Sequence, residues 1–143
     1  MDKLILIADS SDSTTQLFRA YLKSQKYDVC TANATLEAYQ AAKELYFDLI
    51  LVGRLPNFTP FEFADVLLSG PAEGTPILLL VHKTPPNEDI EKLHARCCDY
   101  IISAPLDYGQ LQQKAAVLAG IASPLYFSPS QDPGVDLTWQ GVR

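Results

Sequence analysis

The stretch Phe47-Asp48-Leu49-Ile50-Leu51-Val52-Gly53-Arg54-Leu55-Pro56 decides the fold of this chain. Its apolar run is typical of a strand that is buried on both faces of a parallel sheet. Glycine and proline then end the run. In such a sheet, ligands bind at the carboxyl ends of the central strands. We therefore expect Val52 and Gly53 to point at the functional pocket.

Four further apolar runs predict strands at residues 3–8, 27–31, 76–81 and 100–102. Apolar residues at helical spacing follow every strand. The residues expected to face the core from these five helices are Leu17, Phe18, Tyr21, Leu22, Leu36, Tyr39, Ala42, Tyr46, Phe61, Ala64, Leu67, Leu68, Ile90, Leu93, Cys97, Leu111, Ala115 and Leu118.

This alternation predicts an α/β fold, a doubly wound five-stranded parallel sheet of order 2-1-3-4-5 with five helices on its two faces. The first and third strands then flank the point where the strand order reverses. We expect residues 9–12, 52–54 and 81–82 to line one crevice there.

The composition is that of a globular protein with a single domain. The chain has 143 residues, of which 48% are hydrophobic and 20% charged. The net charge of −6 argues against direct nucleic-acid binding by this domain. No apolar run approaches the roughly 18 residues that a membrane span needs, and no signal-peptide pattern follows Met1, so we expect a cytoplasmic protein without membrane contact.

The character of the sequence changes near residue 122. We predict one domain over residues 3–121 and a proline-containing extension over 122–143. The prolines of this extension exclude a continuous helix, whereas Tyr126, Phe127 and Trp139 make it too apolar for an ordinary flexible linker. Two alternatives stay open: the segment folds back over the domain, or it begins a linker to a second domain.

Five pieces of the chain together resemble a response-regulator receiver domain, a CheY-like member of the flavodoxin-like folds. The resemblance covers about residues 3–121. The pieces are LILIADSSD at 4–12, YDVCTANATLEAYQAA at 27–42, FDLILVGRLP at 47–56, TPILLLV at 75–81 and CDYIISAPL at 98–106.

The resemblance implies a phosphorylation site that this sequence only partly retains. In the family, two acidic residues after the first strand hold Mg²⁺ and an aspartate after the third strand accepts phosphate. Here Asp9 keeps one acidic position, Ser10 replaces the other, and Asp12 compensates only if the turn is rearranged. The phosphoacceptor position falls on Gly53, or on Val52 when counted back from the proline, and neither residue can form an acyl phosphate.

Two more positions depart from the pattern of the family. Val81 replaces the hydroxyl residue that follows the fourth strand, and Ala104 replaces the lysine that precedes a proline. Tyr100 occupies the aromatic switch position. Without the acceptor, the second acid and the lysine, we expect no phosphoryl transfer and no phosphorylation-gated switch.

These departures predict a pseudo-receiver that is independent of phosphorylation. We expect no enzyme activity, no cofactor and no metal, and we interpret Asp9 and Asp12 as a vestigial acidic pocket. The expected role is a protein-interaction or dimerisation module in bacterial signal transduction or transcription regulation, binding a protein partner or a second copy. By resemblance, the contact face lies on the fourth helix, fifth strand and fifth helix, with Lys92, Arg96, Gln110, Gln113 and Lys114 outermost.

Alternatives remain at the same crevice. The Ser/Thr-rich turn at 10–14 suits a flavodoxin-like protein that binds a flavin or another phosphate ligand, although it lacks glycine and contains two acids. A receiver with an unusual register, in which Asp12 is repositioned, is a second alternative. His94, Cys97 and Cys98 have a spacing that suits a metal site, but we interpret the cysteines as core residues.

Overall fold

The computed structural model describes residues 3–103 and 105–120, in which five strands alternate with five helices. In chain order the elements are β1 (Leu4–Ala8), α1 (Asp12–Ser24), β2 (Asp28–Ala32), α2 (Thr35–Glu44), β3 (Leu49–Val52), α3 (Pro60–Leu68), β4 (Ile77–Val81), α4 (Asn87–Ala95), β5 (Asp99–Ile102) and α5 (Tyr108–Leu118). The predicted extension over 122–143 lies outside the described residues. No helix in the described part is long and apolar enough to cross a membrane.

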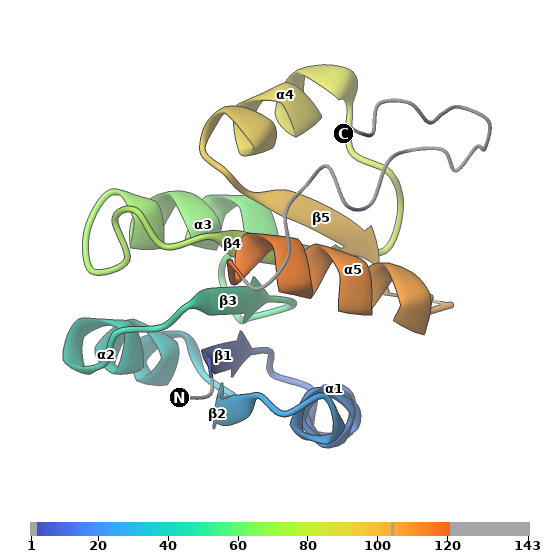
Figure 1. Cartoon of the computed structure of the whole chain (residues 1–143). Helices are drawn as coiled ribbons and strands as arrows, with labels where there is room; N and C mark the ends of the chain where they lie inside the picture. The colour runs from blue at the N-terminus through green and yellow to red at the C-terminus, as the bar shows by residue number, and fades with distance from the viewer. Residues whose placement is uncertain (1–2, 104, 121–143) are drawn as a thin grey trace, which may run out of the picture.

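The sheet has the predicted order, β2-β1-β3-β4-β5, and all of its pairs are parallel (Figure 1). In the register, Ile50 of β3 lies between Leu6 of β1 and Ile77 of β4. The predicted fold class is therefore confirmed.

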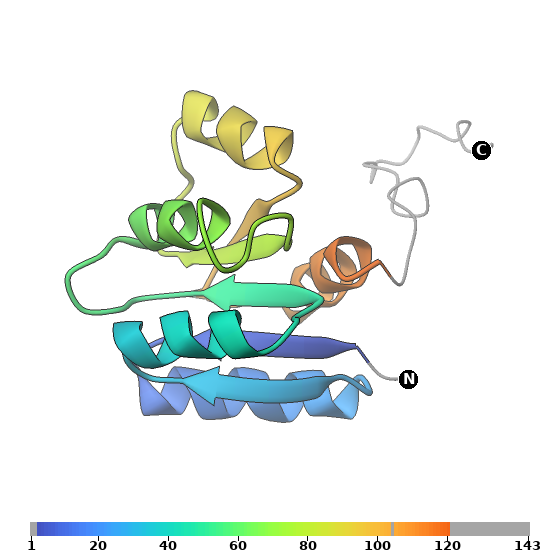
Figure 2. The same cartoon turned by 90° about the vertical axis from the view of Figure 1, so that its left-hand side faces the viewer.

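Helices cover both faces of the sheet, with α1 and α5 on one face and α2 and α3 on the other (Figures 1 and 2). The strand β3 contributes alternate residues to the two cores. Ile50 and Val52 pack with α2 and α3, whereas Leu49 and Leu51 pack with α1 and α5. All four side chains are fully buried, which explains why this strand is a continuous apolar run rather than an alternating one.

Three residues that were predicted to face the core are exposed instead. Leu17 is 50% exposed, because α1 packs through Phe18 and Leu22 and the adjacent position points away from that face. Leu36 is 69% exposed, since α2 lies on the sheet through two alanines. Tyr46 follows the end of α2 and is 93% exposed.

The prediction that Cys97 faces the core is wrong, and the end of α4 shows why. The helix stops at Ala95, and Cys97 adopts a left-handed backbone with φ of 60°. This turn leaves Cys97 exposed and places Cys98 in the core in its stead. The helix itself buries one side chain, Leu93, and Figure 2 shows it standing apart from α3.

Candidate functional site

A small pocket lies at the carboxyl ends of β1, β3 and β4, as the sequence predicted. Its volume is about 200 Å³. The lining residues are Asp9, Thr14, Arg54, Pro60, Leu80, Val81, His82 and Ser103. Asp12 is not among them, because it is the exposed first residue of α1.

The carboxylate of Asp9 is folded into the protein. Its side chain is buried, and Oδ1 accepts a hydrogen bond of 2.8 Å from the backbone N–H of Ser11. Oδ2 accepts one of 3.2 Å from the backbone N–H of Arg54. Hydrogen bonds to an ionised carboxylate are the stronger kind. One side chain therefore joins the loop after β1 to the loop after β3.

Backbone contacts reinforce this junction. The Gly53 N–H donates to the Ala8 carbonyl at 2.8 Å, and the Ser10 N–H donates to the Arg54 carbonyl at 2.7 Å. Asn33 donates a further bond of 3.0 Å, from its side-chain amide to the Asp9 carbonyl. The two loops are thus fixed relative to each other over several residues.

Gly53 leaves the space that the Asp9 carboxylate fills. A Cβ at position 53 would overlap Asp9 Oδ2 and would lie 2.8 Å from Asp9 Cγ. The backbone of Gly53 is not in the left-handed region, so the glycine is required by the neighbouring carboxylate and not by its own φ. The sequence predicted a missing acceptor here, but it gave no sign that Asp9 occupies its place.

The sequence analysis placed Arg54 and His82 at this crevice, but it did not predict that their side chains bond to each other at the mouth of the pocket. The Arg54 guanidinium donates a hydrogen bond from Nη2 to Nε2 of His82, and both side chains are exposed. Since Nε2 accepts, this bond needs a neutral His82 with its proton on Nδ1. The available signal was that each residue is the first charged or polar one after a central strand.

The remaining pocket positions offer little polar chemistry. Val81 is half-buried, and its carbonyl accepts a hydrogen bond of 3.3 Å from the Ser103 hydroxyl. Ala104, predicted to replace the family's lysine, lies outside the described residues. Within the described part of the chain, no three His, Cys, Asp or Glu side chains gather as ligands for a metal ion.

Tyr100 lies in a polar network across β5 and α5. Lys114 Nζ donates to the Tyr100 carbonyl at 2.7 Å and lies 4.7 Å from the centre of its ring. The same ammonium is 3.5 Å from Asp99 Oδ1, which His94 Nε2 contacts at 3.3 Å. The network connects α4, β5 and α5, and of its members only Tyr100 and Lys114 were predicted as site residues.

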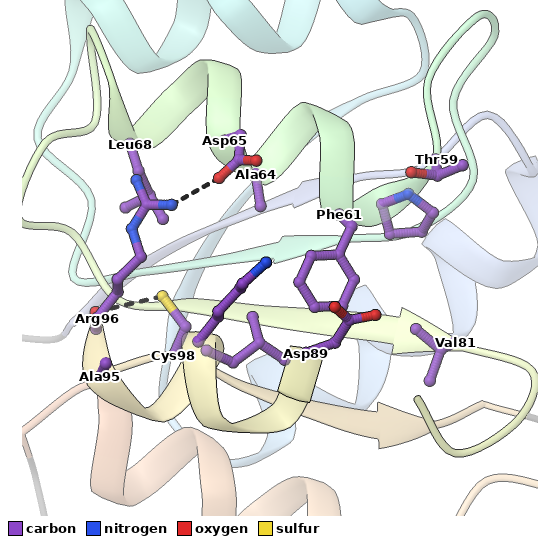
Figure 3. Close-up of a pocket in the computed structure, with 13 residues that line it drawn as sticks. Thr59, Phe61, Ala64, Asp65, Leu68, Val81, Asp89, Ala95, Arg96 and Cys98 are labelled. Carbon is purple, nitrogen blue, oxygen red and sulfur yellow. Dashed lines mark hydrogen bonds and ion pairs between the residues drawn. The ribbon is translucent and has the colours of Figure 1, made fainter. Parts of the chain in front are cut away.

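The five predicted contact residues are divided between two surfaces. Gln110, Gln113 and Lys114 lie on α5. Lys92 and Arg96 instead line a groove between α3 and α4, where Arg96 pairs with Asp65 (Figure 3).

This groove, which we call the α3–α4 groove, is the larger hollow, with a volume of about 640 Å³. Its lining residues are Thr59, Pro60, Phe61, Ala64, Asp65, Leu68, Val81, Asp89, Lys92, Leu93, Ala95, Arg96 and Cys98. Figure 3 shows side chains from α3 and α4 facing each other across it. Burial raises the pKa of the Cys98 thiol above its usual value, so this cysteine is held in its neutral form.

Comparisons of sequences find similarity to parts of bacterial transcriptional regulatory proteins. No model of a known protein family matches it. The transcriptional regulatory protein ZraR of Klebsiella oxytoca is 29% identical over 110 residues, which make up 76% of this chain and 24% of ZraR. The transcriptional regulatory protein SrrA of Staphylococcus aureus is 29% identical over 103 residues, 71% of this chain and 42% of SrrA. The chain therefore spans less than half the length of these curated relatives.

A solved structure gives a similar result. The chemotaxis protein CheY4 of Vibrio cholerae superposes with a TM-score of 0.71 at 26% sequence identity. The match covers 82% of this chain and 99% of that one. It therefore takes in nearly the whole of the chemotaxis protein.

Proposed function

The fold and the sequence relatives support a response-regulator receiver domain of two-component signalling, and on that premise we propose that this domain acts by protein contact without aspartyl phosphorylation. The similar regulators are transcriptional regulatory proteins by name, and the chain matches only a part of each. We extend the proposal to transcription regulation only for a whole protein, in which residues outside this domain contact the nucleic acid.

The position of the Asp9 carboxylate carries the proposal. Phosphoryl transfer to a receiver needs a carboxylate nucleophile after β3, and Gly53 supplies none. The space beside Gly53 is filled by Asp9, whose two oxygens already accept backbone hydrogen bonds. A side chain held in this way stabilises the loops that a phosphoryl group would otherwise bridge.

The charges around the pocket also argue against phosphorylation, because they disfavour both Mg²⁺ and a bound anion. Mg²⁺ prefers octahedral oxygen ligands, and a single carboxylate in the pocket, with Ser10 in place of a second acid, binds it weakly. A flavin or a free phosphate is disfavoured as well, because an anion would meet the buried Asp9 carboxylate. The pocket of about 200 Å³ is also smaller than the roughly 300–1,000 Å³ of typical ligand sites.

Treatment with a small phosphodonor tests the proposal. We expect acetyl phosphate with Mg²⁺ to leave the intact mass of the protein unchanged. We also expect Mg²⁺ with beryllofluoride to leave the amide NMR signals of Asp9, Gly53 and Val81 in place. A receiver that retains its acceptor aspartate, treated in parallel, is the positive control.

A phosphorylated adduct would contradict the proposal, and its position would identify the alternative. An acyl phosphate mapped to Asp12 would establish the receiver with a shifted register. Saturable shifts without an adduct, confined to the loop at 10–14, would instead show that the crevice binds an anion.

A further inference from the structure

The strand β2 forms one edge of the sheet and pairs on one side only, with β1. In Figure 1 it is the outermost strand at this edge, with α1 and α2 to its two sides. The Asp28 N–H donates to the Lys3 carbonyl at 2.9 Å. The Ala32 carbonyl accepts from the Asp9 N–H at 3.0 Å. Asp28 and Ala32 therefore turn their backbone groups toward β1.

Val29 and Thr31 point their N–H and C=O groups the other way, out of the sheet, because this direction alternates along a strand. None of these outward groups has a hydrogen-bond partner among the described residues. Val29, Cys30 and Thr31 are only half-buried. The strand contains no lysine and no proline, and its register with β1 is unbroken by a bulge. It thus lacks the usual features that keep an edge strand from pairing.

The opposite edge of the sheet is better protected. The Ser103 N–H donates to the Val81 carbonyl, so Tyr100 of β5 turns its backbone groups outward. The Tyr100 N–H donates to Asp99 Oδ1 at 2.8 Å, and its carbonyl accepts from Lys114 Nζ at 2.7 Å. Side chains of the domain itself therefore occupy this part of the β5 edge, whereas nothing in the described part of the chain does so at β2.

The strand that matches the β2 edge is β2 of a second copy. In an antiparallel pair centred on Cys30, Val29 of one copy faces Thr31 of the other, and these are hydrogen-bonded pairs. All the outward N–H and C=O groups of Val29 and Thr31 then find partners in both copies. Asp28 faces Ala32, so no like charges lie opposite each other. The contact is isologous and closes as a two-fold dimer.

The same register brings the two Cys30 residues together at the two-fold axis. They form a non-hydrogen-bonded pair, in which the Cα atoms lie about 4.5 Å apart. A disulfide joins residues whose Cα atoms are roughly 4.4–6.8 Å apart. Cys30 is a free, half-buried cysteine, so its thiol reports on the centre of the contact.

We propose that two copies of this chain associate through their β2 edges, as an antiparallel pair that continues one sheet across both domains. Backbone hydrogen bonds give the contact its affinity, as in other cases of strand addition. The surface of α5 is left open for a different protein. The proposal does not depend on whether the domain is phosphorylated, so the phosphodonor experiment and the experiments below can fail separately.

Sedimentation equilibrium of the full-length protein tests the proposal. We expect a reversible dimer, and Thr31→Pro should weaken it by about tenfold or more, because each copy loses one donor of the pair. The folded monomer tolerates this proline, since the Thr31 N–H is unused there. Ile102→Pro is the matched control, because Ile102 turns its N–H outward like Tyr100, and it should leave the association unchanged. Far-UV circular dichroism shows whether each variant is folded.

Oxidation gives a second measurement that needs no change in β2. In Cys97→Ser, which lacks the exposed thiol, diamide should take up the two thiol hydrogens of paired Cys30 residues and leave a dimer joined by one disulfide. Cys30→Ser should remove the cross-link and keep the reversible dimer. If Thr31→Pro does not fold, this cross-link decides the question.

Three results would overturn the proposal. The first is a native chain that stays monomeric up to about 1 mM. The second is a dimer that Ile102→Pro weakens as much as Thr31→Pro does. The third is a dimer in which oxidation does not join Cys30 to Cys30.

Discussion

The positions of Asp9 and Gly53 depend on each other. The carboxylate fills the volume that any side chain at position 53 would need, and the glycine leaves that volume open. Asp9 in turn supplies the acceptor for two backbone N–H groups, from Ser11 and Arg54, on separate loops. A change at either position therefore alters the energy of the other.

This dependence predicts a non-additive pair of substitutions. Gly53→Ala should lower the free energy of unfolding by about 1–3 kcal/mol, because the new methyl group overlaps Asp9. Asp9→Ala should cost about 1–3 kcal/mol, since it leaves two N–H groups without their acceptor. The double variant should cost clearly less than the sum. Urea unfolding measures all three values.

Gly70→Ala is the control for the glycine itself. A Cβ at Gly70 would meet its nearest atoms at 3.6 and 3.7 Å, which is ordinary contact. This substitution should change stability by no more than about 0.5 kcal/mol. Additive costs at positions 9 and 53 would show that the two side chains do not compete for one space.

The candidate site could be predicted from sequence only in outline. The ends of the strands located Asp9, Val81 and His82 at one crevice, because parallel strands share an edge. The Asp9 carboxylate turns inward because it accepts hydrogen bonds from the Ser11 and Arg54 N–H groups. The position of residues along the sequence does not reveal such contacts between loops. The bond from Arg54 to His82 joins two loops and was invisible for the same reason.

At the scale of elements, the strands were predictable because each is a continuous apolar run. The inner faces of the helices were predicted less well. Neighbouring apolar residues such as Leu17 and Phe18 compete for one face, and the shape of the sheet decides between them. Ala38 and Ala42 show the second difficulty, since α2 packs closely through small residues and leaves Leu36 outside.

The corner between α1 and β2 makes stability sensitive to alkaline pH. Tyr27 packs there in the core beside α1 and α5, and burial raises the pKa of its hydroxyl, with a smaller contribution from Tyr21. A raised pKa in the folded state means that the folded state holds the proton more tightly. The stabilisation is complete below the unfolded pKa of about 10 and is lost as pH rises through the folded value.

We therefore expect the free energy of unfolding to fall between pH about 8 and about 11, and to fall less in Tyr27→Phe. Urea unfolding at the two pH values gives the comparison. Tyr46→Phe is the control, since this exposed hydroxyl should leave the alkaline loss as in the wild type. If the free energy of unfolding falls equally in the wild type and in Tyr27→Phe, the alkaline loss of stability comes from groups other than Tyr27.

At the scale of the whole molecule, the proposed contact with other proteins has two candidate surfaces in the described part of the chain. One is the α3–α4 groove. The other is formed by α4, β5 and α5, where His94, Asp99 and Lys114 hold the three elements together. Lys114 contacts Asp99 and Tyr100 there, and Gln112 donates a hydrogen bond to Gln25, so Gln110 and Gln113 are the glutamines of α5 better placed to meet a partner.

The paired substitution Gln110→Glu with Gln113→Glu tests the second surface. Two added charges should weaken self-association or partner binding, because an interface excludes charge from its centre. Sedimentation equilibrium measures self-association, and pull-down with the full-length protein from its own cells measures the partner. Gln40→Glu on α2 is the control and should change neither. Unchanged binding in the variant with Gln110→Glu and Gln113→Glu would show that the contact face does not lie on α5.

The carboxylate of Asp9 also has a consequence for engineering of the domain. An aspartate introduced at position 53 would collide with the Asp9 carboxylate and lower stability. Asp9 would have to move as well, and the N–H groups of Ser11 and Arg54 would need new acceptors. A carboxylate can therefore be installed after β3 only together with a change at position 9.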